Sequence, residues 1–130
     1  MRAKKGLKDM AKKILVVDDD EMVLIALEEL LRSRGHQPKT VPGGREALDA
    51  LSQEAFDLVI LDIIMPGMDG YEVCRKIRQE EKWQKLPVIM LTAMSSEEDR
   101  RKGETAGADL FLPKPISPQR LLSLIETAMR

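Results

Sequence analysis

The sequence predicts an α/β fold in which one sheet of five parallel strands is covered by helices on both faces, a doubly wound arrangement. Two observations lead to this prediction. Short apolar runs alternate five times with longer amphipathic segments along the 130 residues. The clearest of these runs are apolar at every position, which is typical of strands buried on both faces and therefore of parallel sheets.

The first two strands and helices follow from local patterns. Residues 14–17 are apolar and stop abruptly at three aspartates, which predicts a buried strand. A helix is predicted over residues 21–34, because its apolar residues recur on one face, its acids come early and its arginines late, and Gly35 ends it. Residues 37–41 give a weaker strand. The turn that follows leads into an amphipathic helix with apolar positions at Ala47, Leu48, Leu51 and Ala55.

The third strand repeats the pattern of the first. Residues 58–61 form an apolar run that stops at Asp62. After a loop that contains proline and glycine, residues 70–79 form a helix with apolar positions on one side. A polar connection over residues 80–86 then leads to the fourth strand.

The last elements complete the alternation. The fourth strand, residues 87–91, ends at Thr92, and a helix over residues 95–106 follows. We expect that helix to be the most mobile, because its interior is polar and Gly103 lowers its helix propensity. Residues 109–112 form the fifth strand and residues 117–129 the last helix, which is amphipathic.

Composition places the chain among folded soluble proteins. Hydrophobic residues make up 43% and charged residues 33%, which excludes a disordered chain. No apolar run reaches the roughly 20 residues that span a bilayer, and no signal peptide is apparent, so we expect a cytoplasmic protein without membrane contact. The single cysteine, Cys74, excludes an internal disulfide and a cysteine-rich metal site, and we expect it in the core.

The charge is unevenly distributed along the chain. Residues 1–13 carry six basic residues against one acid, although the net charge of the whole chain is −1. We therefore divide the chain into a basic N-terminal extension, residues 1–12, and one domain, residues 13–130. The extension has no aromatic residue for base stacking, so we expect a solvated tail and no direct nucleic acid binding.

Carboxylate, hydroxyl and ammonium side chains, which can take part in binding or catalysis, follow the predicted strands. Parallel strands bring their carboxyl ends to one edge of the sheet, where ligands of such folds bind. The carboxylates at this edge need a cation, and oxygen ligands of this kind suit Mg²⁺. A hydroxyl and an ammonium beside them suit a bound phosphoryl group, with one carboxylate as nucleophile. Each residue alone could be a helix cap, a turn residue or a surface charge, but together they indicate phosphoryl chemistry. The residues are Asp18, Asp19, Asp20, Asp62, Thr92 and Lys114.

Four motifs at these strand ends resemble those of the receiver domain of bacterial two-component response regulators, of the single-domain chemotaxis-regulator type. They are ILVVDDD (14–20), DIIMPGMDG (62–70), VIMLTA (88–93) and GADLFLPKP (107–115). The resemblance covers residues 13–130. It implies a flavodoxin-like (βα)5 fold with strand order 2-1-3-4-5 and a phosphoacceptor signalling domain rather than an enzyme.

The resemblance also implies roles for the acidic residues. Asp62 would accept a phosphoryl group from a histidine kinase or a histidine phosphotransfer protein. Asp19 and Asp62 would ligate Mg²⁺ directly, together with the backbone carbonyl of Ile64. Asp18 would act on the metal largely through water.

Further roles follow from the same resemblance. Lys114 would pair with the phosphoryl oxygens, and Thr92 would hydrogen-bond one of them after phosphorylation. The bond between Lys114 and Pro115 would be cis. Phe111 stands where the family has a switch aromatic, and without a hydroxyl it would switch through packing alone.

Two apolar residues bear on the lifetime of the phosphorylated state. Ile64 and Met94 each stand two residues beyond a site residue, so their side chains could overhang the phosphoryl group. Neither can orient a water molecule by hydrogen bonding. We therefore expect slow self-dephosphorylation.

Four other functions are alternatives to a phosphorylated receiver domain: an interaction module, a phosphatase, a histidine phosphocarrier and a flavodoxin. The same fold could serve as a constitutive interaction module. A Mg²⁺-dependent phosphatase would usually have a second acid at position 64, and a flavodoxin would need a phosphate loop where the aspartates stand. With His36 as the only histidine, which we expect on a surface loop, a histidine phosphocarrier is disfavoured.

The sequence indicates the binding partners only in general terms. A downstream protein target is expected, and by family analogy the kinase would contact the first helix. Dimerisation on phosphorylation through the fourth helix, fifth strand and fifth helix is left open. Since the sequence stops after its last helix, either a single-domain regulator or a receiver taken from a longer protein fits it.

Overall fold

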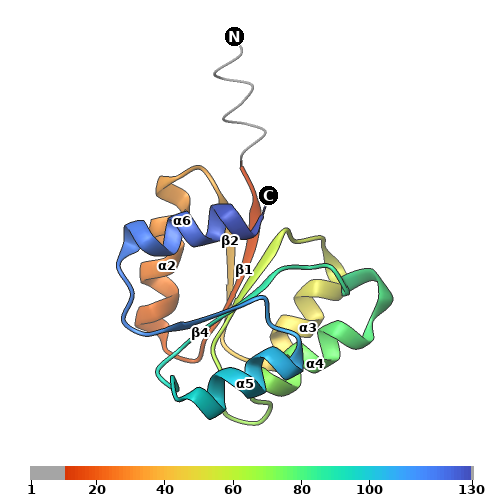
Figure 1. Ribbon diagram of the computed structural model, residues 1–130. Helices are drawn as coiled ribbons and strands as arrows, with labels where there is room; N and C mark the ends of the chain where they lie inside the picture. The colour runs from red at the N-terminus through yellow and green to blue at the C-terminus, as the bar shows by residue number, and fades with distance from the viewer. Residues whose placement is uncertain (1–10, 130) are drawn as a thin grey trace.

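Five parallel strands form one sheet in the order β2-β1-β3-β4-β5, and helices cover both faces, as the sequence predicted (Figure 1). The computed structural model describes residues 11–129. The strands are β1 (Lys13–Val17), β2 (Gln37–Val41), β3 (Leu58–Leu61), β4 (Val88–Thr92) and β5 (Leu110–Pro113). The helices are α2 (Glu21–Ser33), α3 (Gly44–Gln53), α4 (Gly70–Gln79), α5 (Glu97–Ala106) and α6 (Pro118–Ala128), with a 3₁₀ turn η1 (Glu81–Trp83). Residues 1–10 of the predicted basic extension lie outside the described residues.

Alternate residues of the strands point to opposite faces of the sheet, where they form two hydrophobic cores. In β1, Ile14 and Val16 pack under α2 and α6, whereas Leu15 and Val17 pack under α3, α4 and α5. All four are essentially inaccessible to solvent. Burial on both faces explains why the strands are apolar at every position. Cys74 lies in the second of these cores, as predicted, and burial raises the pKa of its thiol to about 11.

Side-chain caps define where several helices begin. The Asp20, Asp69 and Ser117 side chains each accept a backbone N–H from the first turn of α2, α4 and α6. Ser96 and Asp99 form a reciprocal capping box at α5, which therefore begins at residue 97 rather than at 95. These caps satisfy donors that a helix start leaves unpaired.

Gly103 has a packing role that its helix propensity does not reveal. A Cβ atom at this position would lie 2.7 Å from Cδ2 of Phe111 and 3.1 Å from the sulfur of Met90. The glycine therefore lets α5 approach β5 closely enough to rest on the Phe111 ring. Whether α5 is the most mobile helix stays a prediction.

His36 is buried, so its predicted position on a surface loop is wrong. Only 5% of the residue is exposed, and its Nδ1 atom accepts the Lys12 backbone N–H at 3.1 Å. The residue lies between the end of α2 and the start of β2, and Glu126 of α6 faces it. Burial lowers the pKa of the imidazole.

Arg78 joins α4 to the loops at the amino ends of β4 and β5. Its guanidinium donates to the carbonyl oxygens of Trp83 and Leu86 at 3.0 and 2.7 Å. It also donates to the Gly107 carbonyl at 2.9 Å and pairs with Asp109 at 3.0 Å. The predicted polar connection after α4 is thus an ordered turn held by one side chain.

The start of β1 and the end of α6 lie at the same edge of the sheet, opposite the edge where the strands end (Figure 1). In the part of the chain that the structure describes, none of the helices has both the length and the apolar character that a membrane crossing needs.

Candidate phosphoryl and metal site

The sheet topology brings the predicted site residues to one edge. β1 and β3 are neighbours, with Val17 opposite Leu61, so the aspartates that follow these strands lie side by side. The Asp62 N–H donates to the Val17 carbonyl at 3.0 Å. On the other side of β3, the Lys114 N–H donates to the Thr92 carbonyl at 2.9 Å, which fixes the end of β5 beside β4.

Three carboxylates gather at this edge. One oxygen from each of Asp18, Asp19 and Asp62 lies within 4.8 Å of the others. Asp18 and Asp62 are buried, with 3% and 8% of their surface exposed, whereas Asp19 faces solvent. Asp20 has a different task, since its carboxylate caps α2. A set of hard oxygen donors at the surface fits Mg²⁺, which keeps part of its water shell.

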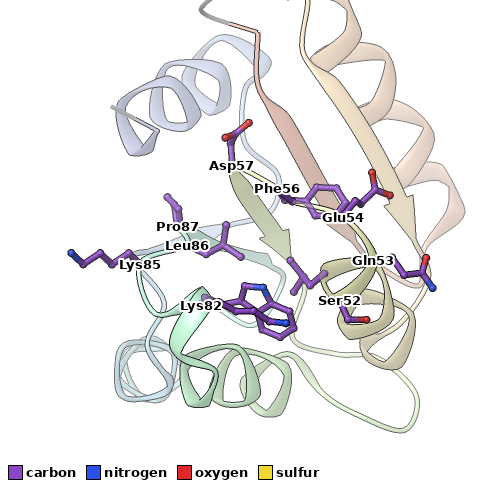
Figure 2. A pocket seen from close by; sticks show the side chains of 12 residues that line it. Ser52, Gln53, Glu54, Phe56, Asp57, Lys82, Lys85, Leu86 and Pro87 are labelled. Atoms are coloured by element: carbon purple, nitrogen blue, oxygen red, sulfur yellow. The ribbon is translucent and has the colours of Figure 1, made fainter.

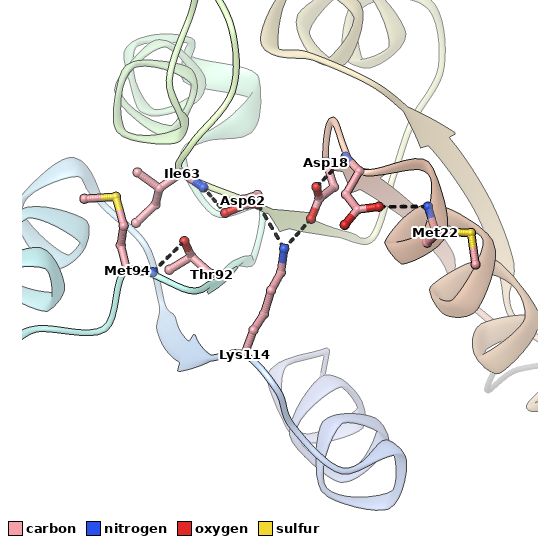
Figure 3. Close-up of polar contacts among 8 residues, drawn as sticks. Asp18, Met22, Asp62, Ile63, Thr92, Met94 and Lys114 are labelled. Atoms are coloured by element: carbon pink, nitrogen blue, oxygen red, sulfur yellow. Dashed lines mark hydrogen bonds and ion pairs between the residues drawn. The ribbon is translucent and has the colours of Figure 1, made fainter.

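Lys114 bridges the two buried carboxylates. Its Nζ atom lies 2.7 Å from Oδ2 of Asp18 and 3.0 Å from Oδ2 of Asp62 (Figure 3). Burial opposes the charge of Lys114, but the two carboxylate hydrogen bonds outweigh it and raise the pKa of the ammonium. For Asp18, burial dominates and raises the pKa of the carboxyl, although the bonds from Lys114 and from the Asp20 N–H oppose this.

Asp62 is held by its own loop. Its Oδ1 atom accepts the Ile63 N–H at 2.6 Å, and the Ile63 carbonyl accepts the Gly70 N–H at 2.8 Å. A Cβ atom on Gly70 would lie 2.2 Å from the Asp62 carbonyl oxygen, so only glycine fits there. The sequence pattern marks Gly70 only as the start of a helix, and its close approach to Asp62 is visible only in the structure.

Thr92 and Phe111 lie on the neighbouring strands β4 and β5. Thr92 is fully buried, and its Oγ1 atom accepts the Met94 N–H at 3.2 Å (Figure 3). Among the described residues, no hydrogen bond joins the Thr92 hydroxyl to the Asp62 carboxylate or to the Lys114 ammonium. Phe111 is half-buried, with its ring against Gly103. The Lys114–Pro115 peptide bond is cis, as the resemblance implied.

The two apolar residues beside the site differ in exposure. Ile64 has 57% of its surface exposed, whereas Met94 is half-buried against the core under α3, α4 and α5. Neither side chain carries a group that could hold a water molecule.

Among the surface grooves of the described residues, two lie at opposite ends of the strands. One, of about 630 Å³, lies between α2 and the start of α6 and includes Lys114, Pro115 and Ile116 in its lining. The other, of about 590 Å³, lies at the opposite edge of the sheet and is lined in part by Phe56 and Trp83 (Figure 2). None of the carboxylates described above lines the second groove.

Comparisons with known proteins agree with this geometry. The family model described as the response regulator receiver domain matches residues 14–126. The transcriptional regulatory protein GltR of Pseudomonas aeruginosa is 43% identical over 117 residues, which are 90% of this chain and 48% of that protein. The chain therefore spans about half the length of this curated relative.

Solved structures are similar over nearly the whole chain. The crystal structure of a putative response regulator from Chloroflexus aurantiacus has a TM-score of 0.88 and 35% identity, covering 92% of this chain and 98% of that one. The BeF3-activated receiver domain of DrrB has a TM-score of 0.82 and 37% identity, covering 92% of this chain and 97% of that one.

Proposed function

The chain belongs to the family of response regulator receiver domains, and on that premise we propose that Asp62 is the phosphoacceptor of a phosphorelay. The phosphoryl group would come from a histidine kinase or a histidine phosphotransfer protein. The observation that carries the proposal is the position of Asp62, whose carboxylate belongs to the acidic cluster and also bonds the ammonium of Lys114. Receiver domains are signalling modules rather than enzymes, so the output of the reaction is a change in binding.

The transfer exchanges one bond for another. A carboxylate oxygen of Asp62 attacks the phosphorus, the bond from phosphorus to the histidine nitrogen breaks, and the imidazole leaves with the electron pair. Lys114 already lies 3.0 Å from Asp62, so its ammonium would meet the phosphoryl oxygens as they arrive. The Asp62 side chain needs little reorientation, because the Ile63 N–H holds its other oxygen.

The metal would be held by the same acids. We assign Mg²⁺ to Asp19 and Asp62 with the backbone carbonyl of Ile64, and to Asp18 largely through water. Bound there, Mg²⁺ would neutralise charge on the transferred phosphoryl group. The three carboxylates fit this ion because they supply hard oxygen donors and net negative charge beside Lys114.

Phosphorylation of Asp62 would then change the conformation of a protein-interaction surface. The Thr92 hydroxyl would leave the Met94 N–H and bond a phosphoryl oxygen, and the space that it leaves would be available to Phe111. The face formed by α5, β5 and α6 would change with them and bind a downstream protein, in the cytoplasm. Within this proposal residues 1–12 are an extension ahead of the domain, residues 13–130.

The test is phosphorylation by a small donor. The protein is incubated with acetyl phosphate and Mg²⁺, and intact mass is measured. We expect one added phosphoryl group, absent in Asp62→Asn and abolished when the metal is chelated. Asp20→Asn is the matched control, because asparagine caps a helix as well as aspartate and this variant should still be phosphorylated.

The alternative is a constitutive interaction module of the same fold. A correctly folded parent protein that gains no mass under these conditions would contradict the phosphoacceptor assignment and favour that alternative. A gain that persists in Asp62→Asn would show that another residue is modified.

A further inference from the structure

α5 is held on the molecule by little apolar contact. Gly103 and Ala106 are its buried residues, and both are small. Its outer face carries three ion pairs at i,i+4 spacing, Arg101 with Glu97, Lys102 with Glu98 and Arg100 with Glu104. Such pairs support the helix itself but not its attachment to the sheet. The few polar contacts to its neighbours therefore have a large share in fixing its position.

The carboxyl end of α5 is firmly attached. Gly107 ends the helix in the left-handed conformation, with a φ of 107°, and its carbonyl accepts the Arg78 Nε–H at 2.9 Å. Arg78 also pairs with Asp109 at 3.0 Å, just before β5. Because the same guanidinium bonds the carbonyls before β4, this end of α5 is tied to α4 and to two strands.

The amino end of α5 is attached by one hydrogen bond from α4. The Tyr71 hydroxyl donates to the backbone carbonyl of Asp99 at 3.0 Å. Asp99 lies in the first turn of α5 and belongs to its capping box. Within residues 11–129, no other hydrogen bond links α4 to this first turn. α4 and α5 lie side by side in Figure 1.

Tyr71 is also close to the acceptor in the chain. It follows Gly70, whose N–H donates to the Ile63 carbonyl and whose Cα lies against the Asp62 carbonyl. Tyr71 is therefore fixed at one end by the loop that carries Asp62 and at the other by α5. It is the one tyrosine in the sequence, while position 111 on β5 has a phenylalanine without a hydroxyl.

We propose that the Tyr71 hydroxyl is a latch that holds the first turn of α5 in the unphosphorylated chain, with the Arg78-bound end of the helix as the hinge. The proposal rests on the function proposed above, because it names one hydrogen bond that opposes the conformational change on phosphorylation. When Thr92 turns toward a phosphoryl group, the segment between β4 and α5 moves, and the first turn of α5 can follow only if the bond to Tyr71 breaks. Tyr71 is thus a positioning residue, since it touches neither phosphoryl group nor metal.

Tyr71→Phe removes the hydroxyl and keeps the ring in its buried place. Hydrogen exchange is measured on the unphosphorylated proteins. We expect the amides of residues 99–102 to exchange roughly three- to tenfold faster in the variant. The amides of Gly107 and Ala108 should be unchanged, because Arg78 holds that end. Thr127→Val is the matched control, since it also removes a hydroxyl bond to a backbone carbonyl, but within α6.

A second readout separates a latch from a merely structural bond. We expect the rate of phosphorylation by acetyl phosphate and Mg²⁺ to rise roughly two- to fivefold in Tyr71→Phe and to stay at the parent value in Thr127→Val.

Each failure points to a different conclusion. Unchanged exchange at residues 99–102 in Tyr71→Phe overturns the latch. Faster exchange without faster phosphorylation overturns its coupling to the switch. If the parent protein takes no phosphoryl group at all, the proposed function fails, whereas the exchange data still decide whether Tyr71 holds α5.

Discussion

Gly70 lies so close to Asp62 that a Cβ atom there would stand 2.2 Å from the Asp62 carbonyl oxygen. The helix that follows the acceptor loop is thus packed against the backbone of the acceptor itself. This contact fixes the distance between β3 and the start of α4, and with it the direction in which the Asp62 carboxylate points.

Gly70→Ala should therefore disturb both stability and metal binding. Relief of the clash requires a backbone shift, which we expect to lower the free energy of unfolding by about 2–3 kcal/mol. The displaced loop should also weaken Mg²⁺ binding. Urea unfolding and calorimetric titration with Mg²⁺ measure the two effects. Gly67→Ala is the control, because its cost comes only from a φ of 80° in open space, and its Mg²⁺ affinity should be unchanged.

Lys114→Met should tighten Mg²⁺ binding in the absence of phosphate. The ammonium bonds Asp18 and Asp62 and partly neutralises the acids that would hold the metal. Its removal should favour the added cation by roughly 1 kcal/mol, about fivefold in affinity. Lys85→Met, on the rim of the groove at the opposite edge, is the control. A weaker Mg²⁺ affinity in Lys114→Met would show that the lysine organises the acids rather than competing for them.

Replacing Ile64 and Met94 together by asparagine and glutamine should shorten the life of the phosphorylated protein. Polar side chains beside the phosphoryl group could orient the attacking water, which the native residues cannot do. We expect hydrolysis to accelerate about tenfold or more. Loss of the added mass after removal of donor measures the rate, with Met22→Gln, another exposed apolar position, as control. An unchanged rate in the double variant would refute the assigned role of both residues.

His36 should make the fold sensitive to acid. Burial lowers the pKa of the imidazole below its ordinary value of 6.5, against the attraction of Glu126 and in the same sense as the repulsion from Arg34 and Lys12. The unfolded chain then binds more protons than the folded one. The contribution to stability is complete above pH 6.5 and is lost as the pH falls from there toward the lowered pKa.

Chemical unfolding between pH 7.5 and pH 5, run on the parent protein and on His36→Asn, measures this contribution. The difference between the two unfolding free energies should shrink as the pH falls through the window, because protonation removes the acceptor for the Lys12 N–H. A constant difference would mean that His36 does not change its protonation on unfolding.

The parallel sheet could be predicted from the sequence because burial on both faces leaves a continuous apolar signal, whereas its strand order came from the resemblance to receiver domains. The positions of Asp62, Thr92 and Lys114 followed from the same signal, since each comes at the end of such a run. The sequence left open whether the three consecutive aspartates cap a helix or join the site. The structure separates them, with Asp20 capping α2 while Asp18 and Asp19 join the acidic cluster.

Other features depend on partners far away in the chain and carry no local signal. From the sequence, Gly103 only lowers the helix propensity of α5. In the structure a glycine is needed there because the Phe111 ring, from the next strand, leaves no room for a Cβ atom. His36 looked like a loop residue, but its environment includes Glu126 near the end of the chain. The bond from Tyr71 to Asp99 likewise joins residues from two helices.

The start of β1 and the end of α6 share the edge of the sheet that lies away from the acidic cluster (Figure 1). A tag, a fluorophore or an immobilising anchor at either end would therefore leave the cluster facing outward. The molecule can therefore be attached to a sensor surface with the acidic cluster accessible to a kinase in flow.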